Sequence, residues 1–250
     1  MRIALDHVII TVDDLDQSMA DFEALGFTVI RGGTHASGTT HNALIAFEDG
    51  TYIELLALTG QAADPNSSAA DFSDLVRGGE GFAGYALFTD DLDGFVSGLQ
   101  QRNSAVSGPT NGYRVREDGI EIQWRSAMPD RGMSPFVIQD ETARHLRVPS
   151  DEALITHANT VIGIDIVICT QDDVNAGIQR YANILNLEPT RTSMGASFHL
   201  DNVTVNVSRA FDDIEASAES RLSRIVLKTR KHETRRLDES RSHQAQIFLI

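Results

Sequence analysis

HVIITVDDL, at residues 7–15, is a short apolar run that ends in two aspartates and a leucine. The pattern returns as GYALFTDDL at residues 84–92 and, shifted by one residue, as IVICTQDDV at residues 166–174. Each run is rich in β-branched or apolar residues and short enough to be a strand. Because the runs are apolar on both faces, we expect each strand to be covered on both sides. The recurrence indicates a chain built from repeated units.

A helix is expected after each run. The apolar residues that follow the acids are spaced by three or four positions, as at Leu15, Met19, Phe22 and Leu25, which places one apolar stripe on a helix. The paired acids therefore fall at helix starts, where capping explains them without a catalytic carboxylate cluster.

A hairpin turn follows late in each unit. The turns between apolar runs are Asp49-Gly50, Asp118-Gly119 and Asp201-Asn202. Asp-Gly is a strong hairpin cue, because a type I′ turn needs two positive φ values. The resulting β-α-β-β-β units are expected at residues 1–59, 80–127 and 157–209, with a shortened unit at 219–250. We predict an α+β fold of tandem units, with a domain over residues 1–140 and a second half over 150–250.

The composition is that of a globular chain of 250 residues, with 41% hydrophobic and 23% charged residues. A net charge of −15 predicts a surface that repels nucleic acid and anionic lipid. We find no apolar run long enough to span a membrane. The single cysteine, Cys169, excludes an internal disulfide and fits a reducing cytoplasm. We expect a cytoplasmic protein whose partner is a small molecule, and a homodimer is left open.

The repeated unit resembles the vicinal oxygen chelate superfamily, which contains glyoxalases, bleomycin resistance proteins and extradiol dioxygenases. Residues 5–15 are similar to the first strand of that superfamily, and residues 51–56 are similar to its fourth. Residues 32–42 and 135–139 resemble the glyoxalase-like domain family in particular. The resemblance implies half-open barrels that pair and bind a metal and a substrate in the cup between them.

The resemblance also implies metal ligands. A histidine on strand one and a glutamate on strand four often bind a divalent metal in this superfamily, and His7 and Glu54 occupy those positions here. Imidazole and carboxylate suit Fe, Mn, Ni, Co or Zn, which would stabilise an enediolate or bind a catechol-like diol. The second unit aligns Gly84 with His7 and Gln123 with Glu54. His41 or the amide of Gln123 would therefore have to complete the metal shell.

Unit one is seven or eight residues longer than the others between its acid pair and its turn, and the extra length falls at residues 31–42. Three glycines and two histidines lie there, and we interpret the segment as a functional loop. The catalytic candidates are Glu54 and His41. The substrate pocket is predicted to be lined by His35, Asn42, Tyr52 and Trp124.

Three functions fit these residues. The first is a metal-dependent lyase, isomerase or dioxygenase that acts on a small oxygenated organic molecule. The second is a metal-free protein that binds and sequesters a small ligand, which the weak ligands of the second unit favour. The third is a metal-free lyase or isomerase that uses Glu54 or a loop histidine as general base.

Strand alternation adds a geometric prediction. His7 lies on one face of its strand and Glu54 on one face of another, and in the resembled fold both faces look into the cup. We therefore expect their side chains to converge, across a metal or in a hydrogen bond. Arg114, Arg116 and Arg125 could hold an anionic substrate, although arginines on strands are usually solvated.

Overall fold

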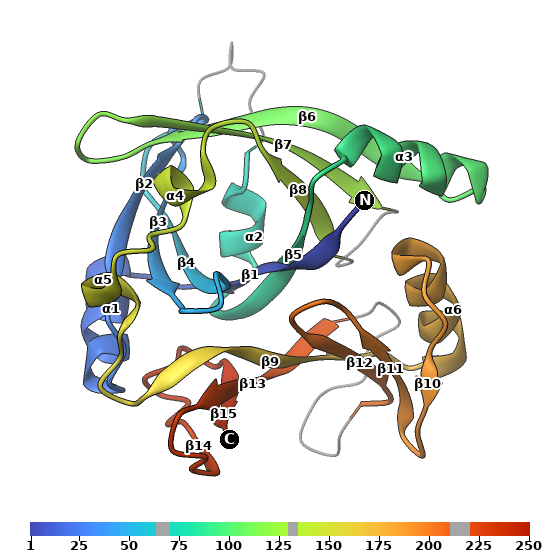
Figure 1. Cartoon of the computed structure of the whole chain (residues 1–250). Helices are drawn as coiled ribbons and strands as arrows, with labels where there is room; N and C mark the ends of the chain where they lie inside the picture. The colour runs from blue at the N-terminus through green and yellow to red at the C-terminus, as the bar shows by residue number, and fades with distance from the viewer. Residues whose placement is uncertain (64–70, 130–134, 211–220) are drawn as a thin grey trace.

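The computed structural model describes residues 1–63, 71–129, 135–210 and 221–250, so the expected start of the fourth unit at residue 219 lies outside the described residues. The described strands form a closed barrel and, beneath it in Figure 1, an open sheet. In these ranges no helix is both long and apolar enough to span a membrane.

The first unit has the predicted β-α-β-β-β order. Its elements are β1 (Ile3–Thr11), α1 (Leu15–Ala24), β2 (Ile30–His35), β3 (Thr40–Ala46) and β4 (Tyr52–Leu58). Asp14 caps α1, because its carboxylate accepts a hydrogen bond of 3.0 Å from the amide of Gln17. The Asp49-Gly50 turn joins β3 to β4, and Phe47 donates across it to the carbonyl of Thr51 at 2.9 Å. The expected loop at residues 31–42 is instead most of a β-hairpin.

The second unit follows a short helix, α2 (Ser73–Arg77). Its elements are β5 (Gly81–Thr89), α3 (Leu92–Gln101), β6 (Val106–Val115), β7 (Glu121–Pro129) and β8 (Phe136–Asp140). The Asp118-Gly119 turn is present, but it joins the second and third strands of this unit, whereas Asp49-Gly50 joins the third and fourth strands of the first. The fourth strand therefore lies beyond residue 127, where we had expected the unit to end.

The barrel has the strand order β1-β4-β3-β2-β6-β7-β8-β5. It goes beyond the half-open form that we expected, because β2 pairs with β6 through Thr34↔Val115 and His35↔Arg114. On the other side β1 pairs with β5 and completes the ring. The long β2–β3 hairpin supplies the residues that reach β6, so the extra length of unit one closes the barrel.

The second half repeats this arrangement in shortened form after two short helices, α4 (Arg144–Arg147) and α5 (Glu152–Ile155). Its elements are β9 (Val161–Thr170), α6 (Val174–Leu185), β10 (Thr190–Arg191), β11 (Gly195–His199), β12 (Thr204–Ser208), β13 (Arg221–Thr229), β14 (Arg235–Arg236) and β15 (Gln246–Leu249). β9 pairs with β13 as β1 pairs with β5, but the strands at the two edges, β10 and β14, have two residues each. The sheet stays open because these edges do not pair.

The main hydrophobic core lies between the barrel and the open sheet. One cluster contains outward-facing residues of the barrel, such as Val8 and Leu55, together with Val167 and Cys169 of β9. Burial raises the pKa of the Cys169 thiol to about 11, as expected for a small buried hydrophobic residue. Because the outer face of β1 and β4 is covered in this way, their inner face is left for the barrel interior.

Candidate active site

The barrel encloses a cavity of about 540 Å³. Apolar and aromatic side chains form most of its wall, including Ile9, Leu56, Phe72, Leu75, Trp124, Phe136 and Ile138. Polar groups converge on one region of this wall, namely His7, His35, Asn42, Glu54, Arg114 and Arg147. An apolar enclosure with a few polar groups in one place is typical of a small-molecule site.

His7 and Glu54 converge as predicted. β1 and β4 are parallel neighbours, with His7 paired to Tyr52 and Ile9 paired to Glu54, and alternation turns all four side chains into the barrel. Nε2 of His7 lies 3.3 Å from Oε2 of Glu54. Both residues are buried, with exposed fractions of 3% for His7 and 7% for Glu54.

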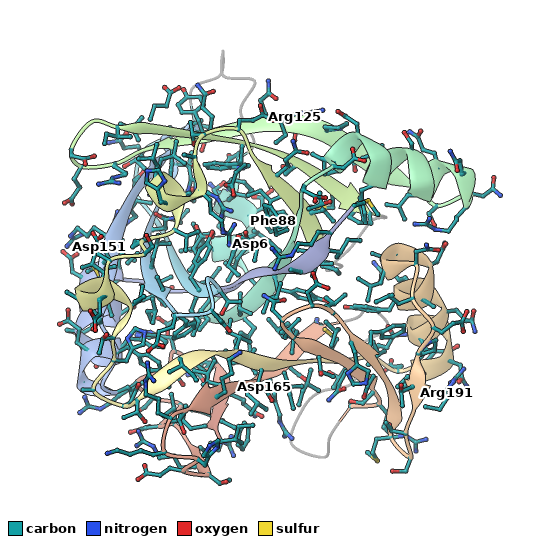
Figure 2. All side chains as sticks on the ribbon, viewed as in Figure 1. Asp6, Phe88, Arg125, Asp151, Asp165 and Arg191 are labelled. Atoms are coloured by element: carbon teal, nitrogen blue, oxygen red, sulfur yellow. The ribbon has the colours of Figure 1, made fainter. Side chains whose placement is uncertain are left out.

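Asp6 holds the other side of the His7 ring. Its Oδ1 atom lies 2.7 Å from Nδ1 of His7, and the register of β1 against β5 shifts between Leu5 and His7, which marks an irregularity in the strand at Asp6. The sequence analysis missed this residue. A signal was present, since an aspartate inside an apolar strand must have a cationic partner if it is buried. Asp6 is fully buried within the barrel (Figure 2).

The cations that neutralise Asp6 come from α4. Arg147 donates from Nη1 and Nη2 to the two oxygens of Asp6 at 2.8 Å each, and Arg144 donates to Oδ2 at 2.7 Å. Both arginines also bind Asp140. Burial works to raise the pKa of Asp6, but the charge and hydrogen bonds of Arg147, with His7 and Arg144, hold that pKa well below its usual range. Two arginines and two aspartates balance in charge at this end of the barrel.

His35 approaches Glu54 from β2. Its Nε2 atom lies 3.6 Å from Oε1 of Glu54, and its Nδ1 atom lies 3.0 Å from Oγ1 of Thr40. The amide of Asn42 donates to the same Glu54 oxygen at 2.6 Å. One carboxylate thus stands between two imidazoles, with His7 at one oxygen and His35 near the other.

The two histidines have opposite pKa shifts. Burial works to lower the pKa of His7, but its contacts with Asp6 and Glu54 outweigh this and raise it. Burial lowers the pKa of His35, and the charge of Glu54 offsets this only in part. Burial alone would raise the pKa of Glu54, but His7, His35 and Asn42 lower it to about 2. At neutral pH these directions favour an imidazolium at His7, a neutral imidazole at His35 and a carboxylate at Glu54.

Aromatic rings fix the positions of the imidazoles. Tyr52 stacks on His7 with ring centroids 4.5 Å apart, and its hydroxyl accepts a hydrogen bond of 2.8 Å from Arg147. His35 meets the Trp124 ring edge-on at 6.2 Å. Of the four residues predicted to line the pocket, His35, Asn42, Tyr52 and Trp124, all lie on the cavity wall.

His41 and Gln123, by contrast, do not lie at this cavity. His41 is half-buried on the outer side of β3, because its neighbours Thr40 and Asn42 point inward. Gln123 is exposed on β7, where its amide donates to Glu121 at 2.6 Å. Neither can join His7 and Glu54 in a metal shell in this structure, so we correct both placements.

The misplacement of Gln123 has a structural cause. Because the Asp118-Gly119 turn precedes a third strand, Gln123 is not the counterpart of Glu54. β8 pairs in parallel with β5 as β4 pairs with β1, and this places Phe136 where the first unit has Glu54. Phe136 packs edge-on against His7 with ring centroids 5.6 Å apart. The second unit therefore faces the site with a phenyl ring.

The donor groups do not fit a divalent metal as they are arranged. Within the described ranges no three His, Cys, Asp or Glu side chains are grouped so that they could hold a metal ion. Asp6 is occupied by Arg147, and Glu54 is occupied by Asn42 as well as by His7. His7 and Glu54 alone provide two ligands, fewer than metal sites in enzymes usually have, and His35 lies near the Glu54 oxygen that Asn42 already occupies.

The sequence was also compared with known protein families and structures. The Glyoxalase-like domain family matches residues 5–185, which cover the barrel from Leu5 of β1 onward and the second half as far as the end of α6. The chain belongs to the glyoxalase-like domain family. A comparison with curated proteins found no match.

Two solved structures share the fold of this glyoxalase-like chain. A hypothetical protein from Staphylococcus aureus aligns with a TM-score of 0.79 and 18% identity over 99% of each chain. 2,2',3-Trihydroxybiphenyl 1,2-dioxygenase from Sphingomonas wittichii strain RW1 aligns with a TM-score of 0.54 and 11% identity, over 100% of this chain and 90% of that one. At these identities the likeness concerns the fold.

Proposed function

We propose that this protein is an enzyme that moves a proton within the barrel cavity, a lyase or isomerase that acts on a carbonyl compound without a metal. The observation that carries the proposal is the position of Glu54 between two buried imidazoles whose pKa values shift in opposite directions. A neutral and a protonated imidazole in one cavity supply a base and an acid at the same pH.

We assign the base to His35. Its distance of 3.6 Å from Glu54 is too long for a hydrogen bond, so Nε2 is not committed to donating a proton there. With the proton on Nδ1, where Thr40 can accept it, the Nε2 lone pair is available. Glu54 is the poorer base, because a carboxyl group with a pKa of about 2 holds a proton too weakly at neutral pH.

We assign the acid to His7. Asp6 orients the ring through Nδ1, so that the Nε2 proton faces Glu54 and the cavity. The distance of 3.3 Å to Glu54 is long for a charge-assisted hydrogen bond, and a substrate oxygen can therefore share this proton. Glu54 compensates the imidazolium charge while this happens.

The proposed step balances in protons and electrons. His35 takes a proton from the carbon next to the carbonyl, and the electron pair of that C–H bond moves toward the carbonyl oxygen. The oxygen receives a hydrogen bond or the proton from His7, which stabilises the enolate or enol. Return of a proton to carbon gives an isomer, whereas departure of a group from the adjacent carbon gives a lyase product.

The test uses NMR to measure how fast deuterium from D₂O enters a panel of carbonyl compounds. Each compound carries an α C–H bond, and the panel includes α-ketoaldehydes. We expect the wild type to accelerate exchange for at least one compound, and His35→Asn to slow it by roughly 10²–10⁴-fold. His41→Asn is the matched control, since His41 lies on the same hairpin but outside the cavity. Equal rates in His35→Asn and wild type would refute the assignment. Tight binding of panel compounds without any exchange would favour the sequestering protein.

A further inference from the structure

We propose that the substrate carries a single carboxylate and that Arg114 binds it, an inference about substrate class that rests on the proposed function of the cavity. Arg114 lies on β6 and contributes to the cavity wall, yet only 3% of its surface is exposed. Its pairing with His35 across the barrel closure places it beside the proposed base.

The hydrogen-bond partners of Arg114 are neutral. Nη1 donates to the carbonyl of Gly32, and Nη2 donates to the carbonyl of Arg147 at 3.0 Å. No carboxylate among the described residues lies within 4 Å of this guanidinium, in contrast to Arg144 and Arg147, which share Asp6 and Asp140. The positive charge of Arg114 is therefore held in place by the backbone without an ionic partner of its own.

The other buried charges on the side of the cavity that holds His7 and Glu54 are matched. Arg144 and Arg147 balance Asp6 and Asp140, and an imidazolium at His7 balances Glu54. Arg114 adds one positive charge to this balanced set. Burial lowers the pKa of Arg114, because removing the charged guanidinium from water costs free energy. The guanidinium still keeps its proton, as arginines in proteins do. An anionic group of the ligand would offset that cost.

The other side chains that line the cavity indicate the chemical class of the rest of the ligand. Phe72, Trp124 and Phe136 present aromatic rings to the space beside the arginine. Asp71 and Asp74 also line the cavity, and the chain as a whole carries a net charge of −15. These negative charges oppose a polyanion such as a phosphate ester, while one carboxylate can form a bidentate pair with one arginine. The structure therefore favours an apolar or aromatic monocarboxylate.

Calorimetry with two ligands of the same shape tests this. Phenylacetate and phenylacetamide differ in the charged group alone, and we expect wild type to bind phenylacetate about tenfold or more tightly than the amide. Arg114→Gln should remove that preference, and Arg114→Lys should keep part of it. Arg116→Gln is the control, because Arg116 directly follows the strand that carries Arg114, pairs with Asp118 and does not line this cavity.

A second measurement needs no variant, in case Arg114→Gln fails to fold. The carboxyl carbon of ¹³C-labelled phenylacetate reports its own titration, and binding beside a free cation should lower the pKa of the ligand carboxyl. Equal affinity for acid and amide, an unchanged or raised carboxyl pKa, or no binding of either ligand at millimolar concentration would overturn the inference.

Failure of this inference is distinguishable from failure of the proposed function. A carboxylate preference that depends on Arg114, without deuterium exchange in any bound acid, would uphold the arginine site and reject proton transfer. Exchange that depends on His35 but occurs in neutral carbonyl compounds alone would uphold proton transfer and reject the carboxylate.

Discussion

Oε2 of Glu54 lies 3.3 Å from Nε2 of His7, while Asp6 holds the opposite nitrogen of the same ring at 2.7 Å. One imidazole is thus enclosed between two buried carboxylates. Asp6 is already neutralised by Arg147 and Arg144, so Glu54 is the carboxylate whose charge depends most on His7. This relationship sets the protonation state of the site.

Deuterium exchange should depend on pH in a bell shape. The ordinary histidine pKa is 6.5, and that of His35 is lowered by burial while that of His7 is raised by Asp6 and Glu54 against the effect of burial. The base must be neutral and the acid protonated, so activity should rise through a pKa below 6.5 and fall through one above 6.5. Rates measured from pH 4 to 10 check this, and a maximum at either extreme would contradict the assignment.

Asp6→Asn should destabilise the fold and also lower the pKa of His7. Removing the carboxylate leaves Arg147 buried with Asp140 as its remaining anion, which we expect to cost about 3–5 kcal/mol in the free energy of unfolding. The pKa of His7, followed by NMR, should fall because the hydrogen bond to Nδ1 is weakened. Asp140→Asn is the comparison, since Asp140 binds the same arginines without contacting His7. A similar His7 pKa in both variants would argue against this account.

Glu54→Gln should alter the acid sensitivity of stability. The carboxyl pKa is about 2 in the folded chain against 4.5 ordinarily, so Glu54 stabilises the fold above pH 4.5 and loses this contribution as pH falls toward 2. The contribution is at most about 3 kcal/mol. Urea unfolding of wild type should therefore show a steeper loss between pH 4.5 and 2 than unfolding of Glu54→Gln. The exposed Glu121→Gln should follow the wild type, and parallel curves for all three proteins would refute the prediction.

Metal content separates the remaining alternatives. Because no three His, Cys, Asp or Glu side chains among the described residues are grouped so that they could hold a metal ion, protein purified without added metal should contain less than one divalent ion per chain. Treatment with EDTA should leave the melting temperature and the deuterium exchange rate unchanged. Elemental analysis that finds one Fe, Mn, Ni, Co or Zn per chain, lost in His7→Ala, would restore the metal-dependent enzyme that the family resemblance implied.

Local patterns in the sequence determined much of the fold. The repeated apolar runs predicted β1, β5 and β9, and the three acid pairs predicted the caps of the helices that follow. Alternation along β1 and β4, together with the family resemblance, predicted that His7 and Glu54 share the cup. These features are readable because strand alternation and helix capping depend on residues a few positions apart.

Strand alternation would also have predicted that His35 and His41 point to opposite sides of the barrel wall. Because residues 31–42 were interpreted as an irregular loop, alternation was not applied to them. A similar error made Gln123 the counterpart of Glu54. The Asp-Gly turns of the two units were assumed to join corresponding strands, which they do not. A turn motif fixes the local backbone, whereas its place in the sheet depends on which strands pair.

The tertiary structure alone decided the electrostatics of the site. Arg147 reaches Asp6 from a helix that follows the whole barrel in sequence, and Arg114 meets His35 only because β2 closes on β6. No local spacing encodes these contacts, since they follow from the packing of strands distant in the chain. The sequence by itself therefore determined the repeated strands and the helix caps, and it placed His7 and Glu54 each on one face of its strand. Barrel closure decided which charged groups lie beside one another, and a buried charge takes its protonation state from the neighbours that packing brings to it.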